Sequence, residues 1–347
     1  MLALCVTVYH LPGLMDKVQL PLKEGFIIKS FKNKIVSILA LATWVGLSIM
    51  PAFAEDDVVV DTALLHSVAS LPPRAKIILK GLPAEFGAYR FNYKGARCVL
   101  VVIAERSKYV LAPAIIDKTA PTSTIARASK AVVAVNGGYF NLSDGESASY
   151  MVLGSKEVLN PRLNKALTSN PKLAPFLPQI FNRSELRVYQ DRAGQRQYAI
   201  EPHQNAVPAG LKLVHALQGG PRLLPELTSV DEAFVRTEAD GKQVDSIGVN
   251  RTAARTAIGL TASGDKMIIS CAGKGQDEFS SGLTLPDLAA LLKGLGAMDA
   301  LNFDGGTSTT LVVKNGDVKT GSAADYEMLI GRLPETRVRS ILLVGKR

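Results

Sequence analysis

The chain has 347 residues, of which 47% are hydrophobic and 20% are charged. This length suffices for one large domain or two smaller ones, and the hydrophobic content excludes a mostly disordered protein. The net charge is +9, yet the sequence has no basic run with interleaved aromatic side chains and no nucleic-acid-binding motif. We therefore expect no nucleic-acid partner.

Residues 1–54 are predicted to be an N-terminal extension followed by a signal peptide. A basic stretch with three lysines at 29–34 precedes an apolar run at 35–50, and Ala52-Phe53-Ala54 provides a small-x-small cleavage pattern. The apolar run of about 16 residues is shorter than the ~20 that a spanning helix needs, which favours cleavage over a retained membrane anchor. We expect a periplasmic or secreted cell-envelope protein with no stable membrane span after cleavage.

Residues 1–28 are long for a signal peptide, and a start further downstream, with Met15 one candidate, stays an alternative. Removing residues 1–54 takes away five lysines and two acidic residues and lowers the net charge from +9 to +6. A modestly basic exported protein suits anionic envelope polymers or phosphate-bearing glycans.

The first half of the mature chain is predicted to alternate between strands and looser segments. Residues 55–95 read as a lead-in segment with a Pro-Pro break. Residues 98–104 lack polar alternation and predict a strand buried on both faces, and 131–135 predict another after a loop and a helix. Prolines at 161, 171, 175 and 178 break up residues 155–205, which we interpret as an irregular insertion or cover over the core.

The second half is predicted to contain paired strands and one clear helix. Residues 246–260 and 266–271 read as adjacent strands, and 338–344 as a final strand. Thr284 suits the N-cap of a helix whose apolar residues follow i, i+3, i+4, i+7 spacing. Hairpins together with strand–helix–strand units predict an α+β fold: a mixed β-sheet core with flanking helices, forming a single domain over residues 96–347.

Two cysteines, Cys98 and Cys271, fall in predicted strands, and the sequence leaves open whether they pair. An oxidising compartment permits a disulfide, whereas two separate buried thiols are the alternative. No cysteine or histidine spacing indicates a zinc site, so we predict no metal and no cofactor. The oligomeric state is not indicated.

Polar, glycine-bearing segments follow or flank three predicted strands. They are Asn136-Gly137-Gly138-Tyr139, Arg251–Gly259, and the run from Leu301 to Thr310 that contains Asn302 and Asp304-Gly305-Gly306-Thr307-Ser308. Asp-Gly is also a common hairpin signal. An Asp at the end of a buried strand, however, is costly unless it is hydrogen-bonded, metal-bound or used in chemistry. We therefore expect the three segments to share one site.

These segments, together with Gln218-Gly219-Gly220-Pro221-Arg222-Leu223, resemble the phosphodiester glycosidase family, which includes the lysosomal uncovering enzyme and bacterial exopolysaccharide-related proteins. The motifs occur in the family order and cover roughly residue 96 to the C-terminus. One departure is Thr307, which stands where the family usually has a third glycine. The resemblance implies a hydrolase, a glycosidase acting on sugar-1-phosphodiesters such as N-acetylglucosamine-1-phosphodiesters.

Such a reaction stabilises an oxocarbenium-like transition state and expels a phosphate ester, which is a good leaving group. The site then needs one carboxylate, positive charge on the phosphate and backbone N–H donors. The resemblance implies Asp304 as base or nucleophile, Arg255 as the first choice for phosphate and Asn136 as a catalytic polar group. The substrate-binding candidates are Gly137, Gly138, Tyr139, Arg251, Asn302, Gly305, Gly306, Thr307 and Ser308.

If residues 251–255 form a strand, Arg251 and Arg255 share one face. Asp277 and Glu278 could supply a second carboxylate. Thr307 favours a second hypothesis, a non-catalytic glycan-binding or exopolysaccharide-accessory protein. A third is a phosphodiesterase that cuts the P–O bond, which would normally need a metal centre.

Overall fold

The computed structural model describes residues 76–77, 86–272, 282–314 and 326–346. The predicted signal peptide at 1–54, the start of the lead-in segment and the pair Asp277 and Glu278 lie outside these ranges. No described helix is long and apolar enough to cross a bilayer.

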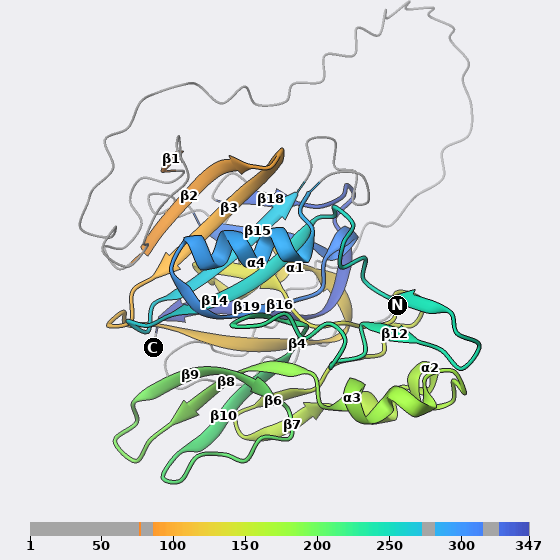
Figure 1. Cartoon of the computed structure of the whole chain (residues 1–347). Helices are drawn as coiled ribbons and strands as arrows, with labels where there is room; N and C mark the ends of the chain where they lie inside the picture. Colours follow the sequence, from red (N-terminus) through yellow and green to blue (C-terminus); the bar gives the residue numbers. More distant parts are fainter. Residues whose placement is uncertain (1–75, 78–85, 273–281, 315–325, 347) are drawn as a thin grey trace, which may run out of the picture.

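The described residues form mostly β-sheet with a few helices (Figure 1). The seven-stranded sheet has the order β1 (Lys76–Ile77), β2 (Phe86–Tyr93), β3 (Ala96–Ile103), β15 (Lys266–Ala272), β14 (Arg255–Thr261), β16 (Ala297–Asn302), β11 (Arg222–Leu224). A five-stranded sheet has the order β18 (Tyr326–Ile330), β17 (Thr310–Lys314), β5 (Val133–Asn136), β19 (Arg337–Lys346), β4 (Tyr109–Pro121).

A second five-stranded sheet, in green tones in Figure 1, has the order β7 (Lys156–Leu159), β6 (Met151–Leu153), β10 (Lys212–Gln218), β8 (Ser184–Gln190), β9 (Arg196–Pro202). The strands β12 (Val235–Thr237) and β13 (Gln243–Asp245) form a separate ribbon. The helices are α1 (Thr122–Ser129), α2 (Lys165–Thr168), α3 (Leu177–Phe181) and α4 (Leu285–Gly294), with 3-10 turns η2 (Pro161–Leu163), η3 (Ala174–Phe176) and η4 (Gly306–Ser308).

The prediction of mixed sheets is wrong for the described residues, because every strand pairing there is antiparallel. The predicted strand–helix–strand unit exists as β15, α4 and β16. Its two strands are not neighbours, because β14 lies between them and pairs antiparallel with both. A crossover that skips one strand therefore produces no parallel pair.

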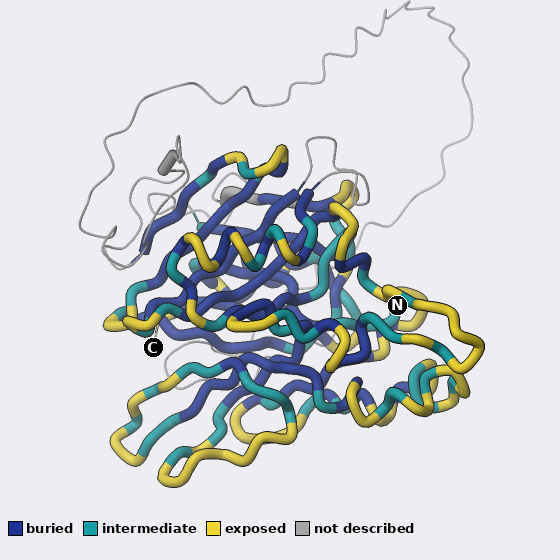
Figure 2. Tube along the Cα trace, viewed as in Figure 1, coloured by how far each residue is buried: buried dark blue, intermediate teal, exposed yellow. Residues whose placement is uncertain are grey.

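The neighbouring strands β3 and β15 are buried almost throughout (Figure 2), which confirms the prediction that residues 98–104 form a strand buried on both faces. Alternate side chains point to opposite faces, so Val99, Val101 and Ile268 enter the core shared with the other sheets. Their neighbours Leu100 and Ile269 enter a second core beneath α4. The sheet is thus the middle layer of the molecule.

Helix α4 confirms the prediction from capping and periodicity. The Thr284 hydroxyl accepts a hydrogen bond from the Asp287 N–H at 3.1 Å. The apolar stripe is buried, with each of the following side chains at most 4% exposed: Leu288, Leu291, Leu292 and Leu295. This stripe packs on β11 and β16 and so supports the strand that ends at Asn302.

The proline-rich segment at 155–205 contains more regular structure than its sequence indicates. Its first part holds β7 and short helical turns, and its second part forms β8 and β9. The strand β8 pairs with both β9 and β10. The lead-in segment likewise ends in β2, a paired strand of the seven-stranded sheet.

Cys98 and Cys271 lie directly opposite each other in the β3–β15 ladder, with their Sγ atoms 2.7 Å apart. Both thiols are buried, and burial raises the pKa of the Cys271 thiol well above its ordinary value. Opposed Cα atoms in an antiparallel pair are about 4.5–5.5 Å apart, within the range that a disulfide spans.

We expect this pair to form a disulfide when the protein folds in the presence of a dithiol–disulfide oxidant. The bond should add about 2–4 kcal/mol to the free energy of unfolding. Intact mass should fall by two hydrogens, and the thermal midpoint should drop on reduction. Cys98→Ser should abolish both effects, whereas two thiols still titratable after oxidative refolding would contradict the prediction.

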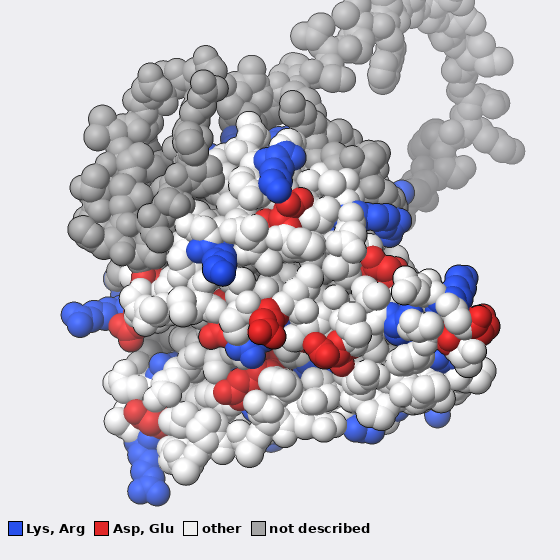
Figure 3. All heavy atoms as spheres, viewed as in Figure 1, with Lys and Arg blue, Asp and Glu red and all other residues white. Residues whose placement is uncertain are grey.

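On the face drawn in Figure 3, basic and acidic side chains are interspersed and form no continuous patch of one sign. The formal excess of positive charge is therefore not concentrated on this face. On this face we therefore identify no basic surface that would bind an anionic partner.

Candidate active site

Four chain segments meet where β5, β10 and β16 end and β14 begins. The Asp304 N–H donates to Gly137 O at 3.0 Å, and the Gly306 N–H donates to Ala254 O at 2.7 Å. The Gly220 N–H donates to Asn302 O at 2.8 Å. The expectation that the polar, glycine-bearing segments come together is confirmed.

Asp304 lies two residues after the end of β16 and keeps part of its surface accessible to solvent. Its Oδ1 accepts a hydrogen bond from the Gly305 N–H at 2.9 Å. Burial among protein atoms raises the pKa of the Asp304 carboxyl to about 6, although hydrogen bonds from Ser308 and Gly305 act in the opposite direction. A carboxyl that titrates near neutral pH is suited to proton transfer or nucleophilic attack.

Asn136 is fully buried and links three segments of the site. Its Nδ2 donates to Asp304 O at 2.6 Å, and its Oδ1 accepts from the Thr256 hydroxyl at 2.8 Å and from the Thr310 N–H at 3.1 Å. These contacts engage both ends of the amide. The structure therefore places Asn136 where it positions the Asp304 main chain, rather than where it contacts a substrate.

Tyr139 and Asn302 form a second link behind Asp304. The Tyr139 hydroxyl donates to Gly220 O at 2.8 Å, and Asn302 Nδ2 donates to the Tyr139 hydroxyl at 2.9 Å. Burial raises the pKa of Tyr139 above its ordinary range, and the nearby charge of Asp304 raises it further. Tyr139 therefore acts as a neutral hydrogen-bonding group.

The ring of Tyr139 lies against Phe234, with ring centroids 5.3 Å apart. Asn302 is 1% exposed, and its buried Oδ1 has no hydrogen-bond partner within the part of the chain that the structure describes. Both residues are in the site where the sequence predicted them, as parts of its inner wall.

Arg255 begins β14 and points into the protein, where it is 3% exposed. Its Nε donates to Leu283 O at 3.0 Å and its Nη1 to Ile247 O at 3.0 Å. Its Nη2 donates to Gly248 O at 2.5 Å and to Arg251 O at 2.8 Å. Four main-chain carbonyls thus occupy most of this guanidinium.

The expectation that Arg251 and Arg255 share a strand face is wrong, because β14 starts only at Arg255. Arg251 lies in the preceding bend, and its N–H donates to Gly248 O at 3.0 Å. Arg251 is exposed whereas Arg255 is buried.

The glycines after β5 are required for packing. A Cβ on Gly137 would lie 2.7 Å from the Ser340 hydroxyl, and a Cβ on Gly138 would lie 2.3 Å from Gln218 O. Both glycines are buried. They allow close approach between chain segments, so their placement gives them no direct contact with a substrate.

We expect Gly138→Ala to lower the free energy of unfolding by about 3 kcal/mol or more, because backbone must move to admit the methyl group. The matched control is Gly294→Ala in α4, where nothing lies within 4 Å of the added Cβ. That change should be neutral or stabilise by about 0.5–1 kcal/mol. Urea denaturation of both variants measures the difference, and equal midpoints would contradict the packing role.

The substrate-binding candidates Gly305, Gly306 and Thr307 could hold phosphate or a sugar hydroxyl only through main-chain N–H groups that are not already engaged. The Gly305 N–H donates to Asp304 Oδ1, and the Gly306 N–H donates to Ala254 O. Of the three N–H groups, that of Thr307 is the remaining candidate for a substrate contact. Ser308 is 2% exposed, and its hydroxyl hydrogen-bonds to Asp304. The turn thus serves mainly to hold the carboxyl.

Sequence reasoning missed Arg183, Glu232 and Phe234, which lie beside Tyr139. The Arg183 guanidinium stacks on the Phe234 ring, with Cζ 3.7 Å from the ring centroid. The charges of Arg183 and Glu232 both act on the pKa of Tyr139. No local motif marks these residues, since Arg183 falls in the proline-rich segment and Phe234 in a loop.

Among the described residues, no three His, Cys, Asp or Glu side chains are grouped as metal ligands would be.

A family model described as phosphodiester glycosidase matches residues 129–344. The match spans more than half of the chain and contains the segments that carry Asn136, Arg183, Arg255 and Asp304. No curated protein matches the chain.

Three solved structures have similar folds. A hypothetical protein from Synechocystis is 19% identical, with a TM-score of 0.52, and the match covers 80% of this chain and 64% of that one. The catalytic domain of zebrafish N-acetylglucosamine-1-phosphodiester alpha-N-acetylglucosaminidase, auto-inhibited by its pro-peptide, is 16% identical, with a TM-score of 0.52 and coverages of 79% and 88%. A protein from Burkholderia pseudomallei K96243 is 15% identical, with a TM-score of 0.50 and coverages of 77% and 75%. At these identities the likeness shows the fold alone.

Proposed function

The chain belongs to the phosphodiester glycosidase family, and from this premise we propose that it is an exported hydrolase that cleaves a glycosyl-1-phosphodiester in an envelope or extracellular glycan. An N-acetylglucosamine-1-phosphodiester is the model substrate. The export signal predicted at residues 1–54 supports a periplasmic or secreted location.

One observation carries the proposal: Asp304 is a partly accessible carboxyl, with a pKa of about 6, at the point where the four segments meet. The other polar groups that the sequence predicted around it already make hydrogen bonds within the protein: Asn136 and Arg255 to main-chain carbonyls, and Asn302 to the Tyr139 hydroxyl. Such an arrangement holds one reactive group rigidly, as catalysis requires.

In the proposed reaction the bond between the sugar C1 and the phosphate oxygen breaks, and its electron pair stays on that oxygen. If Asp304 is the base, it removes a proton from the water that attacks C1. If Asp304 is the nucleophile, its oxygen bonds to C1 and water releases the sugar in a second step. The products are a free sugar and a phosphomonoester in both cases, with inversion for the first course and retention for the second.

The departure at Thr307 does not oppose this proposal. Thr307 lies in η4 and is not among the described residues with a positive φ, whereas its neighbour Gly306 has a φ of 58°. Threonine is therefore accommodated without backbone strain. An accessory glycan-binding protein remains the outcome to expect if binding is found without turnover.

The test uses the mature protein from Glu55 onward, an aryl N-acetylglucosamine-1-phosphodiester and water labelled with ¹⁸O. Mass spectrometry of both products shows which bond broke. Label in the released sugar supports the proposal. Label in the phosphate indicates a phosphodiesterase, and saturable binding without turnover indicates the accessory protein.

A further inference from the structure

Three arginine side chains in the described structure are buried, and two of them are engaged by protein groups. Arg255 donates to four main-chain carbonyls. Arg187 pairs with Glu185 at 2.8 Å and Glu201 at 3.2 Å and also donates to main-chain carbonyls, among them Asn205 O. Neither guanidinium has a free edge for a ligand.

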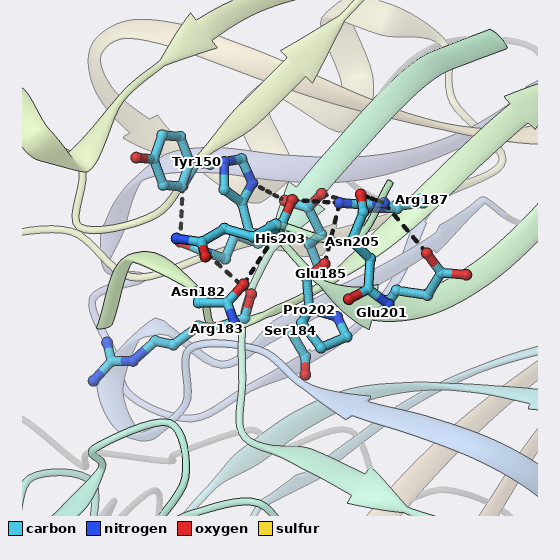
Figure 4. Close-up of polar contacts among 12 residues, drawn as sticks. Tyr150, Asn182, Arg183, Ser184, Glu185, Arg187, Glu201, Pro202, His203 and Asn205 are labelled. Carbon is cyan, nitrogen blue, oxygen red and sulfur yellow. Dashed lines mark hydrogen bonds and ion pairs between the residues drawn. The ribbon is translucent and has the colours of Figure 1, made fainter. Parts of the chain in front are cut away.

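The third, Arg183, is different. It is 8% exposed, and its Nε donates to Glu232 O at 3.0 Å. Within the described residues, no acceptor lies in hydrogen-bond range of either Nη atom. Figure 4 shows its guanidinium pointing away from the network formed by Glu185, Arg187 and His203, although these residues are close in sequence.

In the described part of the chain, no Glu232 oxygen pairs directly with the Arg183 guanidinium; the two Glu232 oxygens accept from neutral donors instead, although the Glu232 charge still favours the protonated form of Arg183. Glu232 Oε1 accepts from the Ser184 hydroxyl at 2.8 Å and from the Arg222 N–H at 3.1 Å, and the Thr228 hydroxyl donates to it at 2.5 Å. Its Oε2 accepts from the Ser184 N–H at 3.2 Å. Burial accordingly lowers the pKa of Arg183 to about 10. A buried cation that makes no direct ion pair is costly unless a ligand supplies the anion.

The position of Arg183 relative to Asp304 is set by aromatic rings. The Phe234 ring contacts both the Arg183 guanidinium and the Tyr139 ring. The Tyr139 hydroxyl in turn lies within 3.5 Å of Phe303 O, the residue before Asp304. The charges of Asp304 and Arg183 both act on the pKa of Tyr139, in opposite directions, so both groups lie near Tyr139.

We propose that Arg183, rather than Arg255, binds the phosphate of the substrate through its two free Nη groups, with Phe234 as the platform that holds the guanidinium flat. This inference rests on the proposed function and names the anionic end of the same site. A sugar-1-phosphodiester has a reacting carbon with an anionic phosphate next to it, which matches a carboxyl and a guanidinium that both lie near Tyr139. As the C1–O bond breaks, the added charge on the phosphate oxygen faces Arg183.

The first test is a binding measurement that needs no turnover. Phenyl phosphate stands for the phosphomonoester product, and methyl N-acetylglucosaminide stands for the sugar without phosphate. Titration calorimetry should show Arg183→Ala weakening phenyl phosphate binding by about 10- to 100-fold, as expected for hydrogen bonds to a charged group. The affinity for the methyl glycoside should stay unchanged.

Arg162→Ala is the matched control. Arg162 also donates through its Nε, to the Tyr150 hydroxyl at 2.8 Å, and also stacks on a phenyl ring, with Cζ 4.4 Å from the Phe181 centroid. The Arg162→Ala variant loses the same kinds of contact as Arg183→Ala, but it should leave phosphate binding unchanged. Equal effects of the two variants on phenyl phosphate would overturn the proposal.

Arg183→Lys covers the case in which the alanine variant does not fold, since it keeps the charge and loses the two-pronged donor. It should weaken phenyl phosphate binding by an intermediate factor, and wild-type affinity in a folded Arg183→Lys would overturn the assignment. Added guanidinium ion should partly restore binding in Arg183→Ala, which a purely structural role would not produce.

The two proposals fail separately. Arg183-dependent phosphate binding without any hydrolysis would reject the hydrolase and keep the phosphate site. Hydrolysis with an unchanged KM and kcat in folded Arg183→Ala would keep the hydrolase and reject the site.

Discussion

Replacing Asp304 by asparagine is expected to lower turnover of a sugar-1-phosphodiester by about 100- to 10,000-fold, the usual range for a general base or nucleophile. Asparagine keeps the size and the hydrogen-bond acceptor for Gly305 and Ser308, so the turn should survive. The measurement is kcat with the aryl substrate, together with circular dichroism to show an unchanged fold. Turnover that remains intact in Asp304→Asn would remove Asp304 from the mechanism.

The same carboxyl should determine the pH dependence of the wild-type enzyme. Its pKa in the folded protein is about 6, so a base or nucleophile at this position becomes active as the pH rises through this value. The rate should therefore show an ascending limb near pH 6. A rate that falls over this interval would assign Asp304 to general acid catalysis.

The free energy of unfolding should fall as the pH rises, whereas the rate increases, because folding raises the pKa of Asp304 above its value in the unfolded chain. The folded state binds more protons between the ordinary aspartate pKa and about 6, so the Asp304 contribution favours folding at low pH and becomes unfavourable as the pH rises through this window. Above about pH 7, Asp304→Asn should therefore stabilise the protein by up to about 3 kcal/mol, less where solvent reaches the carboxyl. Below about pH 3, where the carboxyl is largely neutral in both states, the two proteins should melt alike.

Patterns that depend on local sequence predicted much of this structure. The apolar run of β3, the capped helix α4 and the arrival of Asp304 at the end of a buried strand all follow from periodicity and turn chemistry. The meeting of the glycine-bearing segments was also foreseen, because their polar groups need partners once the flanking strands are buried.

The failures concern properties that depend on tertiary neighbours. Strands β15 and β16 do not pair with each other, because β14 lies between them and pairs antiparallel with both. No local pattern in the sequence indicates this insertion. Arg183 lies in a proline-rich segment that reads as an irregular cover, and its significance arises only from Phe234 and Tyr139. An arginine in a motif can equally brace the backbone or bind a ligand, and the sequence does not distinguish these roles.

Arg255 provides the direct test of that distinction. Its guanidinium donates to four main-chain carbonyls from two segments and is buried, and burial lowers its pKa from the ordinary value. Lysine keeps the charge but lacks the planar donor array, so Arg255→Lys leaves several buried carbonyls unsatisfied. We expect the free energy of unfolding to fall by roughly 3–5 kcal/mol.

Arg251→Lys is the matched control, because Arg251 is in the same segment but exposed. It should change the urea midpoint little, since exposed substitutions usually stay within about 0.5 kcal/mol. If Arg255 instead gripped the phosphate, as its motif suggested, Arg255→Lys would raise KM while leaving the urea midpoint near that of the wild type. A lowered midpoint with phosphate affinity retained in the folded fraction would identify Arg255 as the residue that holds the Gly248–Arg251 loop against β14, and would leave the anion to another guanidinium.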